Sequence, residues 1–346
     1  MKRNVDLARL ERDWGIISMA MDFMPSEYKR DFDLAMDAQP ALVTTPSGGI
    51  PAWLTSYVDP EVIHILQAPN AGADILGERK EGDWTTQTAF FQVVENTGEV
   101  SSYGDFNTNG RSDANTTWPQ RQSYLFQTVI EYGDLQVDRA GAARLNWVSE
   151  LQTSAAATLD KFQDYSYHFG VSGLQNYGML NDPSLSAALT PATKAAGGVK
   201  WINNNAPVAT ANEVYADVQA LFGLLVAQTA GRVKTKDAMT LAMAPGSEVA
   251  LTVTNSFGVS VEDLLKKNFP NLTVKTSYRY ATASGNVVQL VADKFDGKDT
   301  GFCAFNEKMR DHQVVRALSS YQQKKTSGTW GAVIRYPVAV TQMLGV

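Results

Sequence analysis

The sequence predicts an α+β fold of two compact parts with appendages, and three observations carry this prediction. Residues 134–168 have a single apolar stripe at helical spacing, which is typical of one long helix. Residues 84–95 and 123–132 are strand-like and are separated by a long polar stretch. After Gly170 the chain alternates between short helical and strand patterns, which indicates a mixed α/β domain.

The composition is that of a folded protein, since 44% of its 346 residues are apolar and 19% are charged. Thirty Lys and Arg against 36 Asp and Glu give a net charge of −6. This balance argues against a dedicated nucleic-acid binder, which needs a basic face to displace counterions from phosphate. The N-terminus lacks the apolar core of a secretory signal, and no stretch approaches the roughly 18 apolar residues that span a bilayer. We therefore expect a soluble protein.

The first 60 residues predict an N-terminal arm. Within residues 1–38, apolar side chains recur at spacings of three and four, and Pro25 interrupts this helical pattern. Residues 39–51 are rich in Pro, Gly, Ser and Thr and are expected to be extended. Such an arm must pack either on its own body or on a neighbour.

Residues 84–132 predict a long two-stranded arm with a polar tip. Trp84–Glu95 and Ser123–Tyr132 are rich in Thr, Val, Phe and Tyr, and the residues between them are rich in Asn, Gly, Ser and Thr. An isolated hairpin is only marginally stable in water, so its faces are expected to pack against something else.

The long-helix prediction covers Asp134–His168. Its apolar stripe is formed by Leu145, Val148, Leu151, Ala155, Leu159 and Phe162. One unbroken helix of this length would be about 50 Å long, the dimension of a spine for a flat domain. The alternative is an ordinary core helix that is broken at Gly141.

The second half of the chain shows helix caps and short strands. Thr210 and Glu213 form a capping-box pattern at the start of a helix that ends near Gly231, and Ser260 caps a second, shorter helix. A further helix is expected over residues 247–254. Strands are expected over residues 238–243, 272–279, 287–292 and 301–305, and over the tail, 331–340, where Pro337 suits an edge or an end.

We find no convincing catalytic, cofactor or metal site. His64, His168 and His312 are not at metal-ligand spacing from one another. A nucleophilic pair of Cys303 with His312 would need a third, orienting group, so a buried thiol in a strand is the favoured interpretation of Cys303.

Residues 105–116 resemble the opening of a calcium-binding EF-hand loop, with Asp105, Asn107, Asn109 and Gly110 in the matching positions. However, the twelfth position holds Thr116 in place of the bidentate glutamate, and the flanks are strand-like. An Asn/Gly-rich turn is therefore favoured.

Several segments, taken in this order, resemble a known family. They are Trp84 ahead of Tyr103-Gly104-Asp105, the turn Gly178–Pro183 after the long helix, Val261–Pro270, and the closing run Arg335–Val340. This order resembles the Hong Kong 97-type fold of tailed-phage major capsid proteins, which encapsulin shells share. It looks most like the capsid family first catalogued as domain of unknown function number 2184, over nearly the whole chain from about residue 50.

The resemblance implies a division of the chain into four parts. Residues 1–60 would be the N-terminal arm, and residues 84–132 the extended loop. The peripheral domain, with the spine helix, would comprise residues 61–83, 133–172 and 310–346. The axial domain, a mixed α/β domain, would comprise residues 173–309.

The resemblance also implies a structural, non-enzymatic function. Copies of the chain would assemble into the pentamers and hexamers of an icosahedral phage capsid that encloses double-stranded DNA. The extended loop would lie across a neighbouring subunit, with contacts from Trp84, Phe90, Tyr103, Phe106, Trp118 and Arg121. Further partners would be a portal, scaffolding or decoration proteins, and packaged DNA held by non-specific contact, with no membrane. The protein would be assembled in the host bacterial cytoplasm and located in the virion capsid.

One departure from the family predicts a non-covalent shell. Some members join subunits through a Lys–Asn isopeptide bond whose lysine lies in the extended loop, whereas this chain has no lysine between Lys80 and Lys161. Mature particles boiled in SDS should therefore release a monomer of 37.7 kDa. A ladder of high-mass bands on the gel would contradict this expectation.

Two alternatives remain open from the sequence. An encapsulin would have the same fold but would assemble around a cargo protein, without a portal or packaged DNA. A cytosolic enzyme or ligand-binding protein of two domains would instead be a monomer or small oligomer, with perturbed titrating groups in a cleft between its domains.

Overall fold

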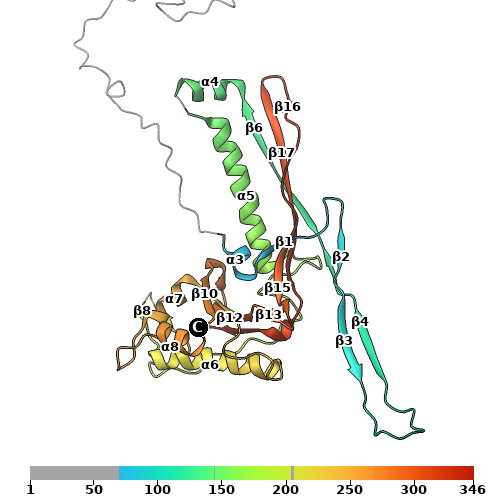
Figure 1. Ribbon diagram of the computed structural model, residues 1–346. Coiled ribbons are helices and arrows are strands. Elements are labelled where there is room, and N and C mark those ends of the chain that lie inside the picture. The colour runs from blue at the N-terminus through green and yellow to red at the C-terminus, as the bar shows by residue number, and fades with distance from the viewer. Residues whose placement is uncertain (1–69, 144, 204–205) are drawn as a thin grey trace, which may run out of the picture. The chain divides into compact units, whose positions relative to one another are not determined.

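The computed structural model describes residues 70–143, 145–203 and 206–346 (Figure 1). The expected N-terminal arm, residues 1–60, lies outside these residues. The chain divides into two units, Met1–Val62 and Ile63–Val346, and every described residue belongs to the second unit. Within the described part, no helix is long and apolar enough to cross a bilayer.

The first of two five-stranded sheets is built around one long strand, β17 (Ser320–Ile334). Its other strands are β1 (Glu78–Lys80), β6 (Tyr124–Gly133), β15 (Gly301–Asp311) and β16 (Val315–Arg316). Strand β17 pairs with β6 from Ser320↔Gly133 to Thr329↔Tyr124 and with β15 from Lys325↔Asp311 to Ile334↔Gly301, so its middle part has a partner on both sides. Helix α5 (Trp147–Phe169) packs on one face of this sheet, where the Phe126 and Phe162 rings lie 4.5 Å apart.

The prediction of one helix over residues 134–168 is wrong, because two helices occupy this segment. Helix α4 (Asp134–Ala142) ends before α5 begins at Trp147. The amide of Leu145 donates to the carbonyl of Ala140 over 2.8 Å, so the chain closes α4 with a wider turn instead of continuing it. The break therefore lies just after Gly141, close to the position that the alternative interpretation gave, since glycine is a poor helix former.

The second sheet also has five strands and forms the larger core. Its strands are β9 (Met239–Met243), β10 (Leu272–Thr276), β11 (Ala281–Thr282), β12 (Gly285–Ala292) and β18 (Val340–Leu344). Strand β9 is buried along its whole length, as its apolar run predicts. Helices α6 (Ala211–Gln228) and α8 (Val261–Asn268) contribute apolar faces to the same core.

Both predicted helix caps are confirmed. The side chain of Thr210 accepts a hydrogen bond from the amide of Glu213, and the Glu213 carboxylate accepts one from the Thr210 amide at 2.8 Å. The Ser260 hydroxyl accepts from the amide of Asp263 at 3.1 Å. These bonds satisfy amide groups that have no partner inside the helix, which is why the two helices begin where they do.

Three further expected elements differ from the structure. The strand expected over residues 272–279 ends at Thr276, and the 3₁₀ turn η4 (Tyr278–Tyr280) follows it. The helix expected over residues 247–254 is a short α-helix, α7 (Pro245–Glu248), followed by a 3₁₀ turn, η3 (Val249–Thr252). The tail is not one strand, because β17 ends at Ile334 and Pro337 opens a 3₁₀ turn, η5 (Pro337–Ala339), before β18. Proline cannot donate to a strand ladder, which explains the interruption there.

Strand pairing differs from the expected division of the chain at two places. Strand β15 starts at Gly301, inside the expected axial segment, but pairs with β17 and β1 in the sheet of the long helix. Strand β18 lies inside the expected peripheral segment but pairs with β12 in the second sheet. The chain therefore crosses between the sheets around Thr300 and again after Ile334, and the Arg335 amide donates to the Thr300 carbonyl at 2.8 Å.

Five smaller elements, besides the turn η4, complete the described fold outside the 84–132 segment. They are helix α3 (Gly72–Leu76) and the paired strands β7 (Ile202–Asn203) with β8 (Ala206–Pro207) and β13 (Lys294–Phe295) with β14 (Lys298–Asp299).

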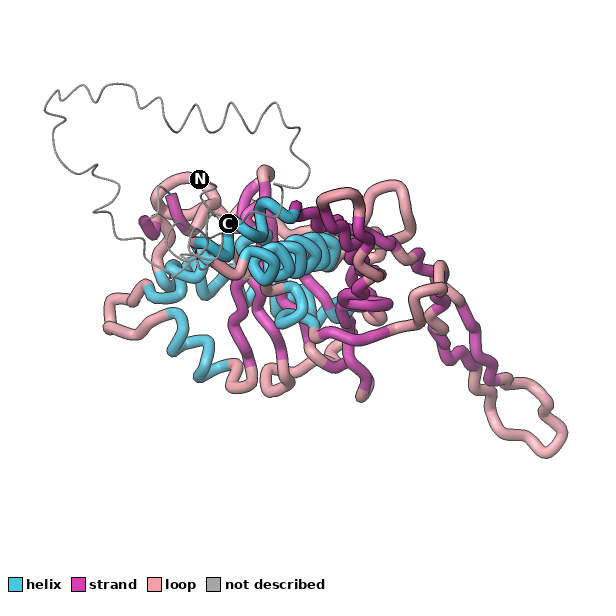
Figure 2. The backbone as a smooth tube through the Cα atoms, turned by 90° about the horizontal axis from the view of Figure 1, so that it is seen from above, coloured by secondary structure: helices cyan, strands magenta, loops and turns pink. Residues whose placement is uncertain are grey.

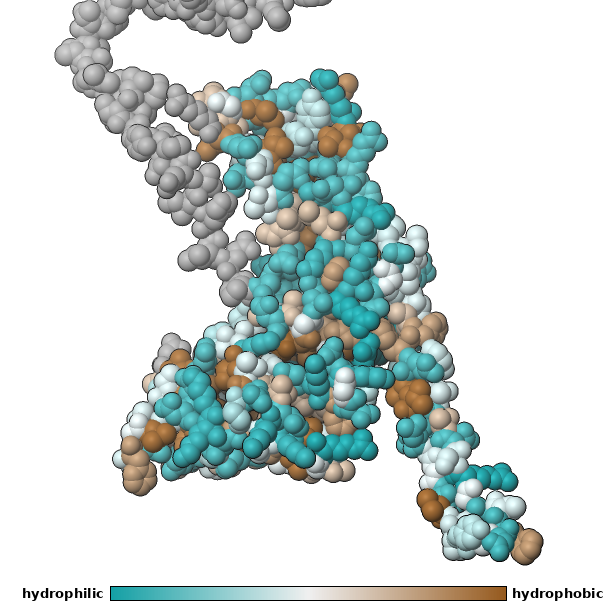
Figure 3. Space-filling view, viewed as in Figure 1, coloured by the Kyte–Doolittle hydropathy of each residue, from teal (hydrophilic) through white to brown (hydrophobic). Residues whose placement is uncertain are grey.

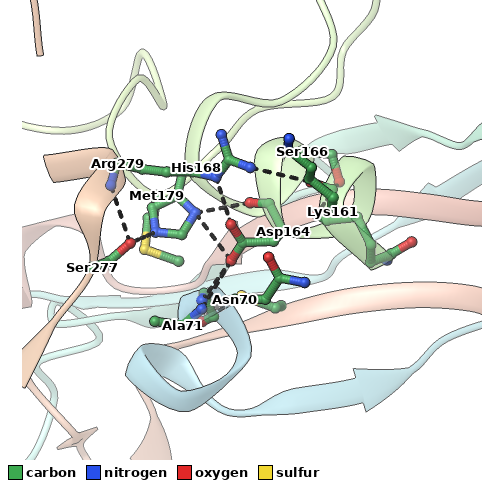
Figure 4. A network of polar contacts seen from close by, with 12 residues as sticks. Asn70, Ala71, Lys161, Asp164, Ser166, His168, Met179, Ser277 and Arg279 are labelled. Atoms are coloured by element: carbon green, nitrogen blue, oxygen red, sulfur yellow. Dashed lines mark hydrogen bonds and ion pairs between the residues drawn. The ribbon is translucent and has the colours of Figure 1, made fainter. Parts of the chain in front are cut away.

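A buried polar network fixes α3 and the turn η4 (Tyr278–Tyr280) against α5 (Figure 4). The Asp164 carboxylate accepts hydrogen bonds from the amides of Ala71 and Gly72, at 3.1 and 2.8 Å, and pairs with the Arg279 guanidinium. Because all three groups converge on one carboxylate, the start of α3 and the turn η4 are held to the same turn of α5.

His168 belongs to this network and is completely buried. Its Nδ1 lies 2.8 Å from the Asp164 carbonyl, and its Nε2 lies 2.9 Å from the Ser277 hydroxyl. Burial is the main cause that lowers the pKa of His168 below the usual 6.5. The ring is therefore neutral in the folded chain, so that Nδ1–H donates and Nε2 accepts.

This lowered pKa predicts a loss of stability in mild acid. Below pH 6.5 His168 binds a proton in the unfolded chain but not in the folded chain, so the free energy of unfolding falls. For one proton the fall is at most about 1.4 kcal/mol per pH unit. The loss stops once the pH passes below the lowered folded pKa. The groups that face the ring are the Asp164 carboxylate and Arg279. Urea unfolding of the unassembled chain at pH 7.5 and 5.5 measures the effect.

The control for this prediction is His168→Gln, which cannot titrate. Its loss of stability between the two pH values should be smaller than that of the wild-type chain, since His64 and His312 are common to both proteins. Equal losses in the two proteins would show that His168 does not set the acid dependence.

Candidate inter-subunit surface

Residues 88–122 of the 84–132 segment form a hairpin that projects from the rest of the described unit, whereas the end of the segment, β6, belongs to the first sheet (Figures 1 and 2). Near the body, β2 (Thr88–Phe90) pairs with β5 (Gln120–Gln122), and further out β3 (Val93–Gly98) pairs with β4 (Ser112–Thr117). The expected strand over residues 84–95 is therefore only partly correct. Trp84 lies in a turn, and the strand is interrupted between Phe90 and Val93, whereas the expected strand over 123–132 is confirmed by β6.

Hydrogen bonds within the tip, residues 99–111, hold its shape. The Asn107 side chain donates to the Ser102 carbonyl at 2.6 Å and accepts from the Asn109 amide at 2.9 Å. Gly110 has φ +88, a left-handed conformation that glycine adopts without strain. The Asn107 amide oxygen is thus occupied by the backbone, and the Asn/Gly-rich turn, the favoured interpretation of this motif, is confirmed.

Large apolar side chains of the hairpin are uncovered in the single chain. At the tip, Val100, Tyr103 and Phe106 are 96%, 93% and 99% exposed, and nearer the base Phe90 and Trp118 remain more than half exposed. Apolar patches are visible along the hairpin and at its end (Figure 3). Such side chains bury no surface in their own chain, so they contribute little to its folding and are available to a partner.

The remaining two predicted contact residues are engaged within their own chain. Arg121 donates to Asp182, with Nη2 and Oδ2 2.7 Å apart, and its guanidinium lies 4.8 Å from the centre of the Tyr177 ring. The Trp84 ring packs edge-on against His312 and beneath the Arg310 guanidinium. These contacts fasten the base of the hairpin to the body, because each joins it to a different part of the described fold.

The two faces of the β3–β4 hairpin differ in charge. Side chains alternate between the faces of a strand, so Glu95 and Asp113 share one face. The other face holds only small or uncharged side chains, which are Val94, Asn96, Gly98, Ser112, Ala114 and Thr116. The hairpin therefore presents one acidic and one neutral face.

The sequence reasoning missed a second exposed surface at the end of the first sheet. Residues 313–319, which contain β16 and the turn that follows it, are exposed without interruption. Among them Leu318 is fully exposed and Val315 is 62% exposed. The only sequence signal is the apolar pair Val314-Val315 next to Leu318 in an otherwise polar segment.

Cys303 and His312 do not form the nucleophilic pair that was considered from the sequence. Cys303 is a buried thiol in β15, as favoured from the sequence, and burial raises its pKa well above the usual value, which leaves it protonated and unreactive. His312 follows the same strand, so nine residues of extended chain place it about 30 Å away. His312 contacts the Thr326 hydroxyl at 3.0 Å instead.

Comparison with known proteins gives a consistent result. The family model described as "Pa193 gp26 major capsid protein" matches residues 41–345. No curated protein sequence matches the chain. Among solved structures, the chain is similar to the capsid of Myoviridae phage XM1, with a TM-score of 0.72 and 15% identity over 87% of this chain and 100% of that one.

Two further structures show the same likeness. The capsid of the native GTA particle has a TM-score of 0.58 at 11% identity, covering 89% of this chain and 100% of that one. The Gordonia phage Cozz chain has a TM-score of 0.55 at 10% identity, covering 89% and 98%. At these identities the structures establish the fold, which is the Hong Kong 97-type fold expected from the sequence.

Proposed function

The chain belongs to the Pa193 gp26 major capsid protein family, and from this premise we propose that its copies form the pentamers and hexamers of an icosahedral phage capsid that encloses double-stranded DNA. A structural role in a phage shell follows from the family itself. The encapsulin alternative is not favoured, because the matching family is one of phage capsid proteins. The role that we assign is structural and not enzymatic.

The exposed hairpin is the observation that supports assembly best. Its strands bury almost none of their side chains, and its tip carries three nearly fully exposed apolar residues. A neighbouring copy that covered these side chains would stabilise the hairpin, which is only marginally stable when isolated. Many modest contacts of this kind, repeated by symmetry, add up to a durable shell.

Among the predicted contact residues, we assign Phe90, Tyr103, Phe106 and Trp118 to the contact itself, since all four are exposed. Trp84 and Arg121 lie at the base of the hairpin, at the edge of the proposed contact, and orient it through their bonds to the body.

The same proposal covers the domains, the partners and the location. Residues 61–83, 133–172 and 310–346 act mainly as the peripheral domain and residues 173–309 mainly as the axial domain, apart from the crossings of β15 and β18. The shell accommodates a portal and binds scaffolding or decoration proteins. The net charge of −6 favours loose, non-specific contact with packaged DNA. Assembly takes place in the host bacterial cytoplasm and ends in the virion capsid.

The direct test is the size of the purified full-length chain. We expect sedimentation and negative-stain electron microscopy to show capsomers or closed particles, because the hairpin needs an adjacent copy. A chain that remains a well-folded monomer at high protein concentration, with the hairpin covered by its own body, would contradict the proposed function.

A further inference from the structure

We propose that Asn109, at the tip of the hairpin, is a site of spontaneous deamidation, and that the modified chain no longer assembles. Asn109 and Gly110 form the only Asn-Gly pair in the sequence. The first part of the inference, the reaction itself, is independent of the proposed function. The second part, the effect on assembly, rests on it.

The reaction needs only water and hydroxide. Hydroxide takes the proton from the backbone nitrogen of Gly110, and this nitrogen attacks the side-chain carbon Cγ of Asn109. A bond between the nitrogen and Cγ forms, the bond between Cγ and Nδ2 breaks, and Nδ2 takes a proton from water and leaves as ammonia. Water then opens the five-membered imide at one of its two carbonyl groups. The product is aspartate or isoaspartate, which carries one new carboxylate, and nothing is oxidised or reduced.

The first argument is that the side chain under attack is free while its backbone is held. The backbone N–H of Asn109 donates to Asn107 Oδ1 at 2.9 Å, and its carbonyl accepts from the Ser101 hydroxyl at 2.7 Å. The side-chain amide of Asn109 forms no hydrogen bond with the described residues, and it is exposed. It is therefore free to turn toward the next residue.

The second argument is that the attacking nitrogen is accessible. Gly110 is exposed, and its backbone N–H donates to no group in the described part of the chain. Its φ of +88 favours glycine, and a Cβ atom added there would lie 3.2 Å from the Ser101 amide nitrogen. The turn thus requires a residue without a side chain, and the same property leaves the nitrogen uncrowded.

Asn107 provides an internal comparison, because it is exposed on the same tip but its side chain is bound. Its amide donates to the Ser102 carbonyl at 2.6 Å and accepts from the backbone of Asn109. The next residue is Thr108, whose branched side chain crowds its backbone nitrogen. Since two hydrogen bonds must break before Cγ is free, we expect Asn107 to react about tenfold or more slowly than Asn109.

The position of Asn109 gives the reaction a consequence for assembly. Its carbonyl is bound to Ser101, which follows the nearly fully exposed Val100. The tip, residues 99–111, has two carboxylates and one arginine, a net charge of −1, and the reaction changes this to −2. A carboxylate that a neighbour covers without a cation loses its hydration and gains nothing in return. A modified tip should therefore bind its neighbour more weakly, so that unassembled chains lose their competence as they age.

The reaction is measured on the freshly purified full-length chain, kept below the concentration at which it assembles, in mildly alkaline buffer. Trypsin releases residues 81–111 as one peptide, which contains both Asn107 and Asn109, and fragment ions locate a mass gain of about 1 Da. We expect the gain at Asn109, about tenfold or more faster than at Asn107, and faster at higher pH. An unchanged Asn109, or equal rates at the two residues, would overturn the inference.

Two variants test the effect on assembly. N109D carries the new charge from the start, and N109S is the matched control, because serine is neutral and cannot form the imide. We expect N109D to lower the yield of capsomers and particles by about tenfold or more, and N109S to assemble like the wild type. Ageing of the unassembled chain should lower the yield of the wild type and leave that of N109S unchanged.

Thermal melting verifies that both variants fold, since the side chain at this position is exposed. Normal assembly of N109D, or an equal loss of yield from aged wild type and aged N109S, would show that the effect on assembly is wrong. A fresh wild-type chain that stays monomeric would instead contradict the proposed function and the second part together. The rate at Asn109 would still decide the first part, so the two failures are distinguishable.

Discussion

Replacement of Val100, Tyr103 and Phe106 together by serine is expected to abolish capsomer and particle formation without unfolding the chain. The three side chains are almost fully exposed, so the free energy of unfolding of a single copy should change by less than about 0.5 kcal/mol. Buried at an interface, aromatic residues of this kind contribute about 2 kcal/mol or more each. The loss recurs in every copy of a shell, so the fraction assembled should fall below detection.

Sedimentation and electron microscopy measure this loss, and circular dichroism verifies the fold. The matched control is V100I/Y103F/F106L, which keeps the tip apolar and should assemble like the wild type. If the serine variant forms normal particles, the tip is not covered by a neighbour. If the apolar control fails as well, the shape of the tip matters more than its burial of apolar surface.

Gly178→Ala is expected to lower the free energy of unfolding by about 4 kcal/mol or more, a loss large enough to threaten the fold of a single copy. A Cβ atom at this position would lie 2.2 Å from the carbonyl carbon and oxygen of His168, which are backbone atoms and cannot turn away. The close approach holds the Gly178–Pro183 turn to the end of α5, where the Met179 amide donates to the Tyr167 carbonyl at 2.8 Å. Alanine would force the turn and the helix apart.

Urea unfolding measures this effect, with Gly223→Ala as the control. Gly223 lies inside α6, and a Cβ atom added there meets nothing within 4 Å. Alanine should therefore stabilise this helix by about 0.5–1 kcal/mol. Equal stability of G178A and the wild type would mean that the turn is not held by this contact.

The elements that could be predicted from the sequence are those whose cause is local. The caps at Thr210 and Ser260 were predictable because the partner of each lies three residues away. The break after α4 could not be predicted, because it depends on one wider turn of the backbone. The partner of β18 could not be predicted either, because β12 is about 50 residues distant in the sequence. No spacing in the sequence encodes which of two sheets a strand joins.

The same distinction applies to the candidate surface. Tyr103 and Phe106 could be predicted to be exposed because a polar, turn-rich segment surrounds them. The ion pair of Arg121 with Asp182 could not be predicted, because the two residues are 61 positions apart in the sequence. The exposed residues 313–319 were missed because their position at the end of the first sheet depends on the pairing of β16 with β17.

Strand β17 has a mechanical consequence for a closed shell. Its residues 320–329 pair with β6 and its residues 325–334 pair with β15, and the chain then continues through η5 into β18 of the second sheet. Tension along this strand would load its backbone hydrogen bonds side by side, in shear, so that many must break at once. If pressure from inside stretches the capsid wall along this strand, the sheet bears the load in the direction in which it is strongest.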